Sequence, residues 1–173
     1  MTFQKGKAED FEKIKSFYWN VIDAMKDKDF SIGWKKGIYP DDDYIRESLE
    51  KGELYTLKDE EKLCACVIVN CSFNEEYEGL PWRKTLKKGE FFVPHALAVA
   101  GDMQGKGIGK EVVGQIIGLA HANNKKAVRL DIVSTNKIAE KLYKSFGFEF
   151  VSENDIYYVD TGHVKYKMYE LNF

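Results

Sequence analysis

The chain has 173 residues and a formal net charge of −2 at pH 7, because 28 acidic residues slightly outnumber 26 lysines and arginines. This length suits one domain over residues 1–173, with a core large enough to be stable without disulfides or metals. Binding of nucleic acid normally requires a basic patch, and the scattered lysines form none. The N-terminus lacks an apolar signal core, and no apolar run approaches the roughly 20 residues that cross a bilayer. We therefore expect a cytoplasmic protein with neither nucleic acid nor membrane as a partner.

The N-terminal half predicts a short strand, two helices and a hairpin, in that order. Residues 3–5 suit a first strand, and apolar residues recur at helical spacing over 11–25. The acidic residues 41–43 suit the first turn of a second helix because carboxylates stabilise the positive end of the helix dipole. Residues 53–57 and 63–71 flank a polar turn, which predicts two paired strands.

Three cysteines lie together in the second strand of this hairpin: Cys64, Cys66 and Cys71. Strand alternation places the first two on one face and the third on the other, so the three thiols could not converge on a metal ion. The pattern favours buried reduced thiols, and we expect no metal site.

The C-terminal half alternates strands and helices after a long polar segment at 73–88. The spacing of Ile138, Leu142 and Phe146 predicts that these residues line the inward face of the last helix, which Gly147 ends. The predicted elements are a strand at 90–99, a helix from 108 to about 124, a strand at 128–132, the last helix, and strands at 148–152 and 164–171.

A glycine-rich loop joins the strand at 95–99 to the helix that begins near 108, and its glycines are Gly105, Gly107 and Gly109. Backbone N–H groups without neighbouring Cβ atoms can close on phosphate oxygens, and the helix N-terminus adds roughly half a positive charge. The loop is therefore interpreted as an anion-binding site; a glycine-rich turn without a ligand is the alternative. A P-loop has a glycine at the position of Gln104, and a dinucleotide-binding fingerprint has one at the position of Lys110. The loop therefore fits neither of these two phosphate-binding motifs.

The spacing of Gln104, Gly107 and Gly109 resembles the Gln/Arg-x-x-Gly-x-Gly/Ala loop of the GCN5-related N-acetyltransferases. A second block, residues 136–148, resembles that family's Asn-x-x-Ala-x-x-Leu-Tyr-x-x-x-Gly-Phe segment. Two such blocks in this order are more specific than either alone. The resemblance implies an α/β fold with a mixed, largely antiparallel sheet, helices on both faces and a splayed central strand pair.

The resemblance also implies that acetyl-coenzyme A is the cosubstrate. Its diphosphate is expected to bind the backbone amides of the glycine-rich loop, and its pantetheine arm the backbone of the strand at 95–99. The resemblance implies a hydrogen bond from Asn136 to the cosubstrate, although this residue could act only as a helix N-cap. The residues assigned to the cosubstrate are Leu97, Ala98, Val99, Gln104, Gly105, Lys106, Gly107, Ile108, Gly109, Lys110, Asn136 and Tyr143.

Acetyl transfer to an amine requires a proton acceptor, because only about one part in two thousand of a lysine-like amine is neutral at pH 7. His95 is the first candidate, since imidazole titrates near neutrality, and arylalkylamine acetyltransferases carry a catalytic histidine at the corresponding place. A structural strand histidine is the alternative, and Glu90 is the reserve candidate. The family carries Tyr143 as the general acid that protonates the departing thiolate; a core tyrosine is the alternative.

These observations predict an acetyl-CoA-dependent N-acetyltransferase that acts on a primary amine of a small molecule. No cysteine stands at a family nucleophile position, which favours direct attack in a ternary complex. A protein or peptide acetyltransferase and a catalytically silent CoA-binding module are the alternatives. Relatives are often dimers, so a homodimer is a possible assembly. The expected acceptor regions are acidic and aromatic, which suits a cationic amine; their aromatic residues are Trp34, Tyr39, Tyr77, Trp82, Tyr157 and Tyr158.

Overall fold

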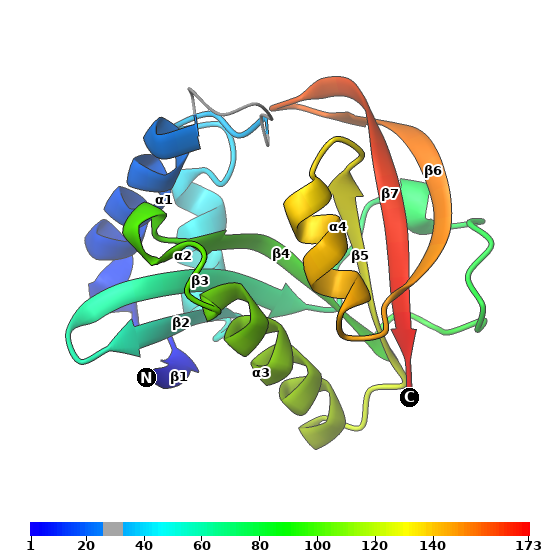
Figure 1. The fold of residues 1–173 in the computed structure, drawn as a ribbon, viewed down its shortest axis with the longest axis horizontal. Helices are drawn as coiled ribbons and strands as arrows, with labels where there is room; N and C mark the ends of the chain where they lie inside the picture. The colour runs from blue at the N-terminus through cyan, green and yellow to red at the C-terminus, as the bar shows by residue number, and fades with distance from the viewer. Residues whose placement is uncertain (26–32) are drawn as a thin grey trace. The chain divides into compact units, whose positions relative to one another are not determined.

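The computed structural model describes residues 1–25 and 33–173, apart from the side chain of Glu76 (Figure 1). The chain divides into two compact units. Unit 1 comprises Met1–Val69 and His95–Val112, and unit 2 comprises Asn70–Pro94 and Val113–Phe173. The strand β4 and the helix α3 are each divided between the two units, and the last residue of β3, Asn70, belongs to unit 2. That the chain forms a single domain stays a prediction.

The fold is mixed α/β, as predicted, and in the described part of the chain the strand order is β1-β2-β3-β4-β5-β7-β6. The sheet is mostly antiparallel, while β4 and β5 pair in parallel. The strands are β1 (Thr2–Lys5), β2 (Leu54–Asp59), β3 (Lys62–Asn70), β4 (Phe91–Val99), β5 (Ala127–Val133), β6 (Glu149–Tyr158) and β7 (Gly162–Asn172). The helices are α1 (Phe11–Met25), α2 (Asp42–Glu50), α3 (Ile108–Ala122) and α4 (Lys137–Lys144), with short 3-10 turns η1 (Ala8–Asp10), η2 (Glu75–Tyr77) and η3 (Gly101–Met103).

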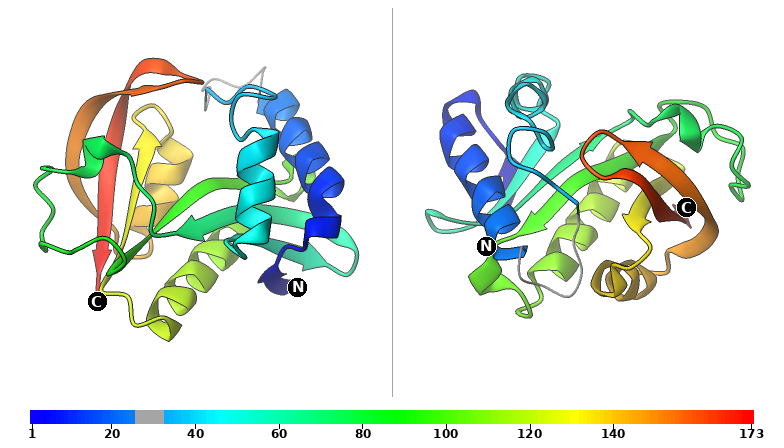
Figure 2. Two further views of the ribbon diagram at one scale, coloured as in Figure 1. Left: turned by 180° about the vertical axis from the view of Figure 1, so that it is seen from behind. Right: turned by 90° about the horizontal axis from the view of Figure 1, so that it is seen from above.

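Unit 1 is built on β1, β2 and β3, with α1 and α2 on one face of these strands (Figures 1 and 2). The helix predicted over 11–25 is confirmed as α1, whose apolar stripe faces the sheet. The N-cap of α2 is Asp41, whose carboxylate accepts a hydrogen bond from the Tyr44 N–H at 2.7 Å. The core of this unit comprises Phe11, Ile14, Phe17, Tyr18, Val21, Ile45, Leu49, Leu54, Cys66, Ile68, Ala96 and Ala98.

Unit 2 is built on β5, β7 and β6, with α4 over one face and the segment 73–88 over the other (Figures 1 and 2). Aromatic residues of that segment, including Phe73 and Trp82, pack against the strands, so this polar stretch is anchored to the sheet. The core beneath the segment comprises Tyr77, Phe91, Val93, Ala127, Ile156, Tyr166 and Met168. The strand predicted at 148–152 is longer than expected, because β6 continues to Tyr158 as one arm of a hairpin with β7.

The prediction for the inward face of α4 is wrong. Ile138 is 69 % exposed, and Leu142 is only half-buried, whereas Tyr143 is 6 % exposed. The polar Glu140 sets this orientation, because its carboxylate accepts hydrogen bonds from Lys167 at 3.1 Å and Tyr169 at 3.0 Å, both on β7. Apolar periodicity could not reveal this arrangement, since a charged residue holds the helix to the sheet.

The cysteine prediction is confirmed for two of the three residues. All three thiols are free, and Cys64 and Cys66 are fully buried within β3. Cys71 follows the end of β3, is half-buried, and lies 3.4 Å from the Lys125 ammonium. Among the described residues, no cluster of His, Cys, Asp or Glu is arranged to hold a metal ion. Within the same residues, no helix has the length and apolar character that a membrane span requires.

Candidate active site

The glycine-rich loop in unit 1 follows η3 and leads directly into α3. Gly105 has a φ of 77° and Gly107 a φ of 84°, a region that L-residues with a Cβ rarely adopt. A Cβ atom added at either position would meet no atom within 4 Å. The glycines are therefore required by the backbone path and not by crowding from neighbouring protein atoms.

Six consecutive N–H groups of this loop, from Gly105 to Lys110, donate no hydrogen bond to the described residues. The helical pattern of donors begins with Glu111, whose N–H reaches the Gly107 carbonyl at 3.1 Å. Most backbone N–H groups in folded proteins have a partner, and a row of free donors at the start of a 15-residue helix is an anion-binding arrangement. The loop therefore fits the diphosphate of a nucleotide cosubstrate.

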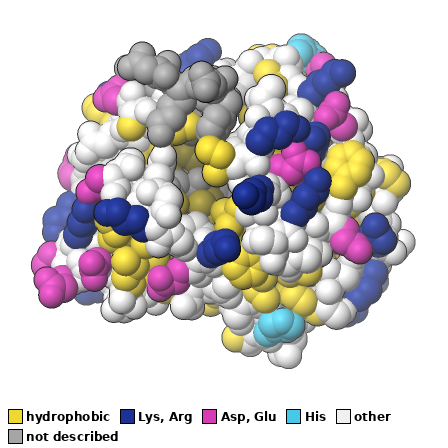
Figure 3. Space-filling model, viewed as in Figure 1, with side chains coloured by type: hydrophobic (Ala, Val, Ile, Leu, Met, Phe, Trp, Pro, Cys, Tyr) yellow, Lys and Arg dark blue, Asp and Glu magenta, His cyan; other side chains and the backbone are white. Residues whose placement is uncertain are grey.

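Charged side chains around the loop favour an anion. Lys106 and Lys110 are exposed within it. Asp102 precedes it but forms an ion pair with Lys62, and the hydrogen bond from this lysine lowers the pKa of the Asp102 carboxyl. The charge of Asp102 is thus compensated within the unit, whereas Glu111 adds a negative charge in the first turn of α3. Lysines, arginines and acidic residues are otherwise intermixed on the face shown in Figure 3.

The strand that leads to the loop carries a local irregularity at Ala96, which has a φ of 48°. A non-glycine residue in this region costs on the order of 1–3 kcal/mol. The buried Tyr18 hydroxyl donates to the Ala96 carbonyl at 2.9 Å and thereby supports the strained residue. The irregularity shifts the buried positions of β4 from Phe91 and Val93 to Ala96 and Ala98.

The backbone of β4 after this irregularity is oriented by its pairing with β3. The Ala100 N–H donates to the Cys64 carbonyl at 2.9 Å. Because N–H groups alternate along a strand, the N–H groups of Val99 and Leu97 point to the opposite edge of β4. The Val99 carbonyl accepts a hydrogen bond from the Gln104 side chain at 3.4 Å, which holds the loop to the end of the strand. His95 is half-buried in the same part of β4.

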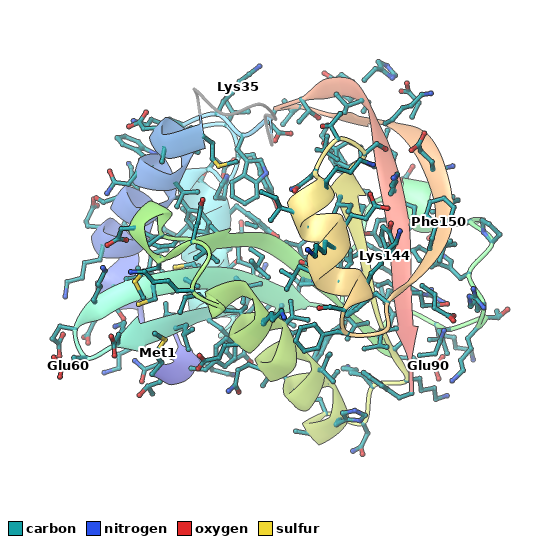
Figure 4. The ribbon with its side chains drawn as sticks, in the orientation of Figure 1. Met1, Lys35, Glu60, Glu90, Lys144 and Phe150 are labelled. Atoms are coloured by element: carbon teal, nitrogen blue, oxygen red, sulfur yellow. The ribbon has the colours of Figure 1, made fainter. Side chains whose placement is uncertain are left out.

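Pairing of β4 with β5 covers two residues, Phe91 and Phe92. So short a register is what the predicted splayed strand pair requires. Glu90 precedes it, at the N-terminal end of β4 (Figure 4). Its carboxylate accepts hydrogen bonds from the Lys126 ammonium at 2.5 Å and the Lys87 N–H at 2.7 Å, and these lower the pKa of Glu90. A carboxylate held in this way is a weaker base, so His95 remains the better candidate.

In unit 2, Asn136 is the N-cap of α4, as the sequence allowed. Its side-chain oxygen accepts a hydrogen bond from the Ala139 N–H at 3.0 Å. The amide nitrogen of Asn136 remains the group that could donate to a cosubstrate. Both interpretations of this residue are therefore compatible.

Tyr143 lies on the side of α4 that packs against the sheet. Its ring contacts Phe148 edge-on, with ring centroids 5.3 Å apart. Its hydroxyl makes no hydrogen bond to the part of the chain that the structure describes. Burial raises the pKa of this hydroxyl well above its usual value, and the charge of Asp131 adds to the shift. Tyr143 therefore stays protonated at neutral pH, as a proton donor must.

A set of ion pairs at Glu140 fixes the helix that carries Tyr143. Lys144, labelled on α4 in Figure 4, donates to Glu140 at 2.8 Å, and Lys137 does so at 3.1 Å. Together with Lys167 of β7, these ammonium groups lower the pKa of Glu140 strongly. The side chain is 14 % exposed, which shields the network partly from water. We conclude that this network orients Tyr143.

Sequence reasoning missed Asp131, a half-buried residue of β5. Its carboxylate accepts hydrogen bonds from the hydroxyls of Tyr77 at 2.5 Å and Tyr158 at 3.2 Å. Burial raises the pKa of the Asp131 carboxyl, and the two hydrogen bonds only partly counter this effect. The available signal was an acidic residue between Leu130 and Ile132 in a strand whose alternate positions are apolar.

The predicted site residues thus fall into two groups. Unit 1 brings together His95, the end of β4 and the loop from Gln104 to Lys110. Unit 2 contains Asn136, Tyr143 and Glu90. Within unit 2, Glu90 forms an ion pair with Lys126.

Comparisons with known proteins agree with this geometry. Residues 19–148 match the model of the acetyltransferase (GNAT) family. The N-acetyltransferase YesJ of Bacillus subtilis (strain 168) is 28 % identical over 148 residues, which cover 83 % of this chain and 78 % of that protein.

Solved structures share the fold at low sequence identity. A GNAT-family acetyltransferase of Streptococcus agalactiae 2603 is 13 % identical and has a TM-score of 0.82, with 99 % of this chain and 95 % of that chain covered. An acetyltransferase of Salmonella typhimurium, solved with its cofactor acetyl-CoA, is 15 % identical and has a TM-score of 0.70. That alignment covers 99 % of this chain and 92 % of the other.

Proposed function

The chain belongs to the GNAT family of acetyltransferases, and on this premise we propose that it transfers an acetyl group from acetyl-coenzyme A to the primary amine of a small molecule. The proposed reaction is direct attack of the amine in a ternary complex. A carbon–nitrogen bond forms as the thioester carbon–sulfur bond breaks, the amine loses a proton, and the thiolate gains one. The cytoplasmic location and the homodimer expected from the sequence stay predictions.

The row of six N–H groups from Gly105 to Lys110, which have no partner in the described part of the chain, supports this proposal most directly. These donors bind the diphosphate of the cosubstrate, assisted by the dipole of α3 and by the ammonium groups of Lys106 and Lys110. The backbone N–H groups of Leu97 and Val99 hold the pantetheine arm by strand-like pairing. Asn136 contributes its side-chain amide.

Two side chains move the protons in this proposal. His95 accepts the proton that the attacking amine loses, since a neutral imidazole is available near pH 7. Tyr143, kept protonated by its burial, protonates the thiolate. Replacement of Tyr143 by Phe should lower kcat by roughly 10²–10⁴-fold. The His95→Ala variant should lose the rise of kcat/KM with pH that reports an essential base.

The proposal is tested first at the loop, with Gly107→Ala. A Cβ at a φ of 84° forces the backbone to shift, so at least one N–H should miss the diphosphate. Loss of one hydrogen bond to a charged group costs about 1.5–3 kcal/mol, which corresponds to a roughly 10- to 100-fold increase in Kd. Isothermal titration calorimetry with acetyl-CoA measures that constant directly.

Gly37→Ala is the matched control, because Gly37 has a φ of 73°, also lies in unit 1, and has no atom within 4 Å of an added Cβ. Its variant should carry the same backbone strain and bind acetyl-CoA normally. Equal Kd values for both variants and the unmodified protein would show that the loop is not part of the binding site.

A second experiment measures thiol release with amines and with peptides as acceptors. It separates an acetyltransferase of small molecules from a peptide acetyltransferase. An absence of turnover with every acceptor indicates a catalytically silent CoA-binding module.

A further inference from the structure

The carboxylate of Asp131 is held by two neutral groups. The hydroxyls of Tyr77 and Tyr158 donate to its two oxygens, one each. No lysine, arginine or histidine forms an ion pair with it within the described residues. The two hydrogen bonds position the carboxylate but leave its negative charge uncompensated.

An uncompensated carboxylate in such surroundings is unusual, since charges removed from water are normally paired. Unit 2 follows that rule elsewhere. The fully buried Glu170 lies beside the Arg129 guanidinium at 2.8 Å. Because a carboxylate offers about four acceptor positions, Asp131 can still accept further hydrogen bonds.

Further tyrosine hydroxyls of unit 2 lie within the electrostatic influence of this carboxylate. The charge of Asp131 raises the pKa of the hydroxyls of Tyr143 and Tyr166 in addition to the effect of burial, which places both within its influence. Tyr158 packs against Tyr166 edge-on at 5.0 Å. Tyr143 is 6 % exposed, and its hydroxyl has no partner in the described chain. Aromatic faces beside a carboxylate favour an organic cation over an inorganic ion.

The residues at this carboxylate are partly exposed. Asp131 and Tyr158 are both half-buried, although burial is the main cause of the raised pKa of the Asp131 carboxyl. Strand alternation directs Asp131 to the face of β5 that the segment 73–88 covers, because its neighbour Arg129 contacts Trp82 of that segment. Tyr158 comes from the end of β6. These are two of the regions whose acidic and aromatic composition suggested a cationic acceptor.

We propose that Asp131, positioned by Tyr77 and Tyr158, binds the ammonium group of the acceptor, so that the enzyme selects small primary amines that are cationic at neutral pH. This inference rests on the proposed acetyltransferase function and adds the residue that determines its substrate class. An ammonium supplies three hydrogen-bond donors for the remaining acceptor positions of the carboxylate and one positive charge that compensates its negative charge. No bond forms or breaks at Asp131. Loss of a proton from the ammonium and attack of the free amine on the thioester remain the steps of the proposed function.

The test compares a cationic with a neutral amine in the Asp131→Asn variant. Benzylamine, tyramine and 1,4-diaminobutane are cations at neutral pH, whereas aniline is uncharged. The amide keeps the shape of the side chain and removes its charge. We expect kcat/KM for the best cationic amine to fall by about 10- to 100-fold, chiefly through a higher KM, because a charge-assisted contact is lost. The value for aniline should change less than threefold, and the Kd for acetyl-CoA should not change.

Tyr158→Phe provides a second variant with little risk to folding, since the half-buried ring stays in place. Loss of one positioning hydroxyl should raise KM for the cationic amine about threefold to tenfold. Equal losses with benzylamine and aniline in Asp131→Asn, or no loss with either, would overturn the inference.

Failure of the proposed function gives a different result from failure of this inference. If the unmodified protein acetylates no amine, the proposed function fails, and binding of benzylamine to the CoA-loaded protein is then measured by calorimetry. Binding that Asp131→Asn weakens at least tenfold supports the ammonium site by itself. Binding that the variant leaves unchanged, or none to the unmodified protein, overturns it.

Discussion

Two carboxylates in unit 2, Glu170 of β7 and Asp131 of β5, differ in how the described protein compensates their negative charge. Glu170 is fully buried and accepts hydrogen bonds from Arg129, from the Arg83 N–H at 3.0 Å and from the Asn172 amide at 2.9 Å. Asp131 is half-buried, and the side chains that donate to it within the described residues are the hydroxyls of Tyr77 and Tyr158. Glu170 lies opposite Arg129 in the register of β5 and β7, and Asp131 follows Arg129 by two residues along β5.

The difference separates a carboxylate that maintains structure from one that is ready for a ligand. The Arg129 guanidinium also lies over the rings of Trp82 and Phe91 and donates to the Lys84 carbonyl at 2.6 Å, so it fastens the segment 73–88 to the sheet. Both oxygens of Glu170 accept hydrogen bonds from the protein. At Asp131 the same kind of strand presents a negative charge that the described protein does not neutralise.

The largest expected effect comes from breaking the satisfied pair with Arg129→Met. Removal of one partner leaves Glu170 buried and unpaired, which should lower the free energy of unfolding by about 3–5 kcal/mol. For a chain of this size the melting temperature should fall by about 6–20 °C. Urea denaturation measures the free energy, and the double variant Arg129→Met with Glu170→Leu is the control. That variant should recover most of the loss, because both charges are gone. A single variant as stable as the unmodified protein would contradict the structural role of Glu170.

Much of the fold could be predicted because its elements follow local rules. The apolar spacing of α1 and the cap at Asp41 mark helices without knowledge of what they contact. The glycines of the loop were also visible, since Gly105 and Gly107 adopt a backbone that other residues avoid. These features are encoded within a few neighbouring residues.

The missed features depend on partners far apart in the chain. Asp131 meets Tyr77, 54 residues away, and Arg129 meets Glu170, 41 residues away. Ala96 adopts a positive φ that no alanine signals in a sequence, and its support comes from Tyr18 on a helix 78 residues earlier. Residue types and spacing alone cannot show which polar groups tertiary packing will bring together.

An intermediate effect is expected at Glu140, which extends the comparison to a partly exposed carboxylate surrounded by three lysines. The hydrogen bonds from Lys144, Lys167 and Lys137 lower the pKa of Glu140, so its stabilising contribution is present above its unfolded pKa of about 4.3 and is lost as the pH falls. Glu140→Gln should cost about 1 kcal/mol at pH 7 and less near pH 3, where the unfolded carboxyl is protonated and part of the contribution is lost. Urea titrations at the two pH values measure the difference, and an equal cost at both would show that charge is not the cause.

The smallest effect on stability is expected at Asp131, and its sign is opposite. Burial raises the folded pKa of Asp131 above its unfolded value of about 3.9. Its stabilising contribution is therefore fully present below that unfolded value and is lost as the pH rises through the folded pKa. Asp131→Asn should match the unmodified protein near pH 3 and be more stable than it at pH 7, by about 1 kcal/mol or less. Urea denaturation at both pH values measures this gain. If the variant is instead destabilised at pH 7, a cation within the protein already compensates Asp131, and the contrast with Glu170 fails.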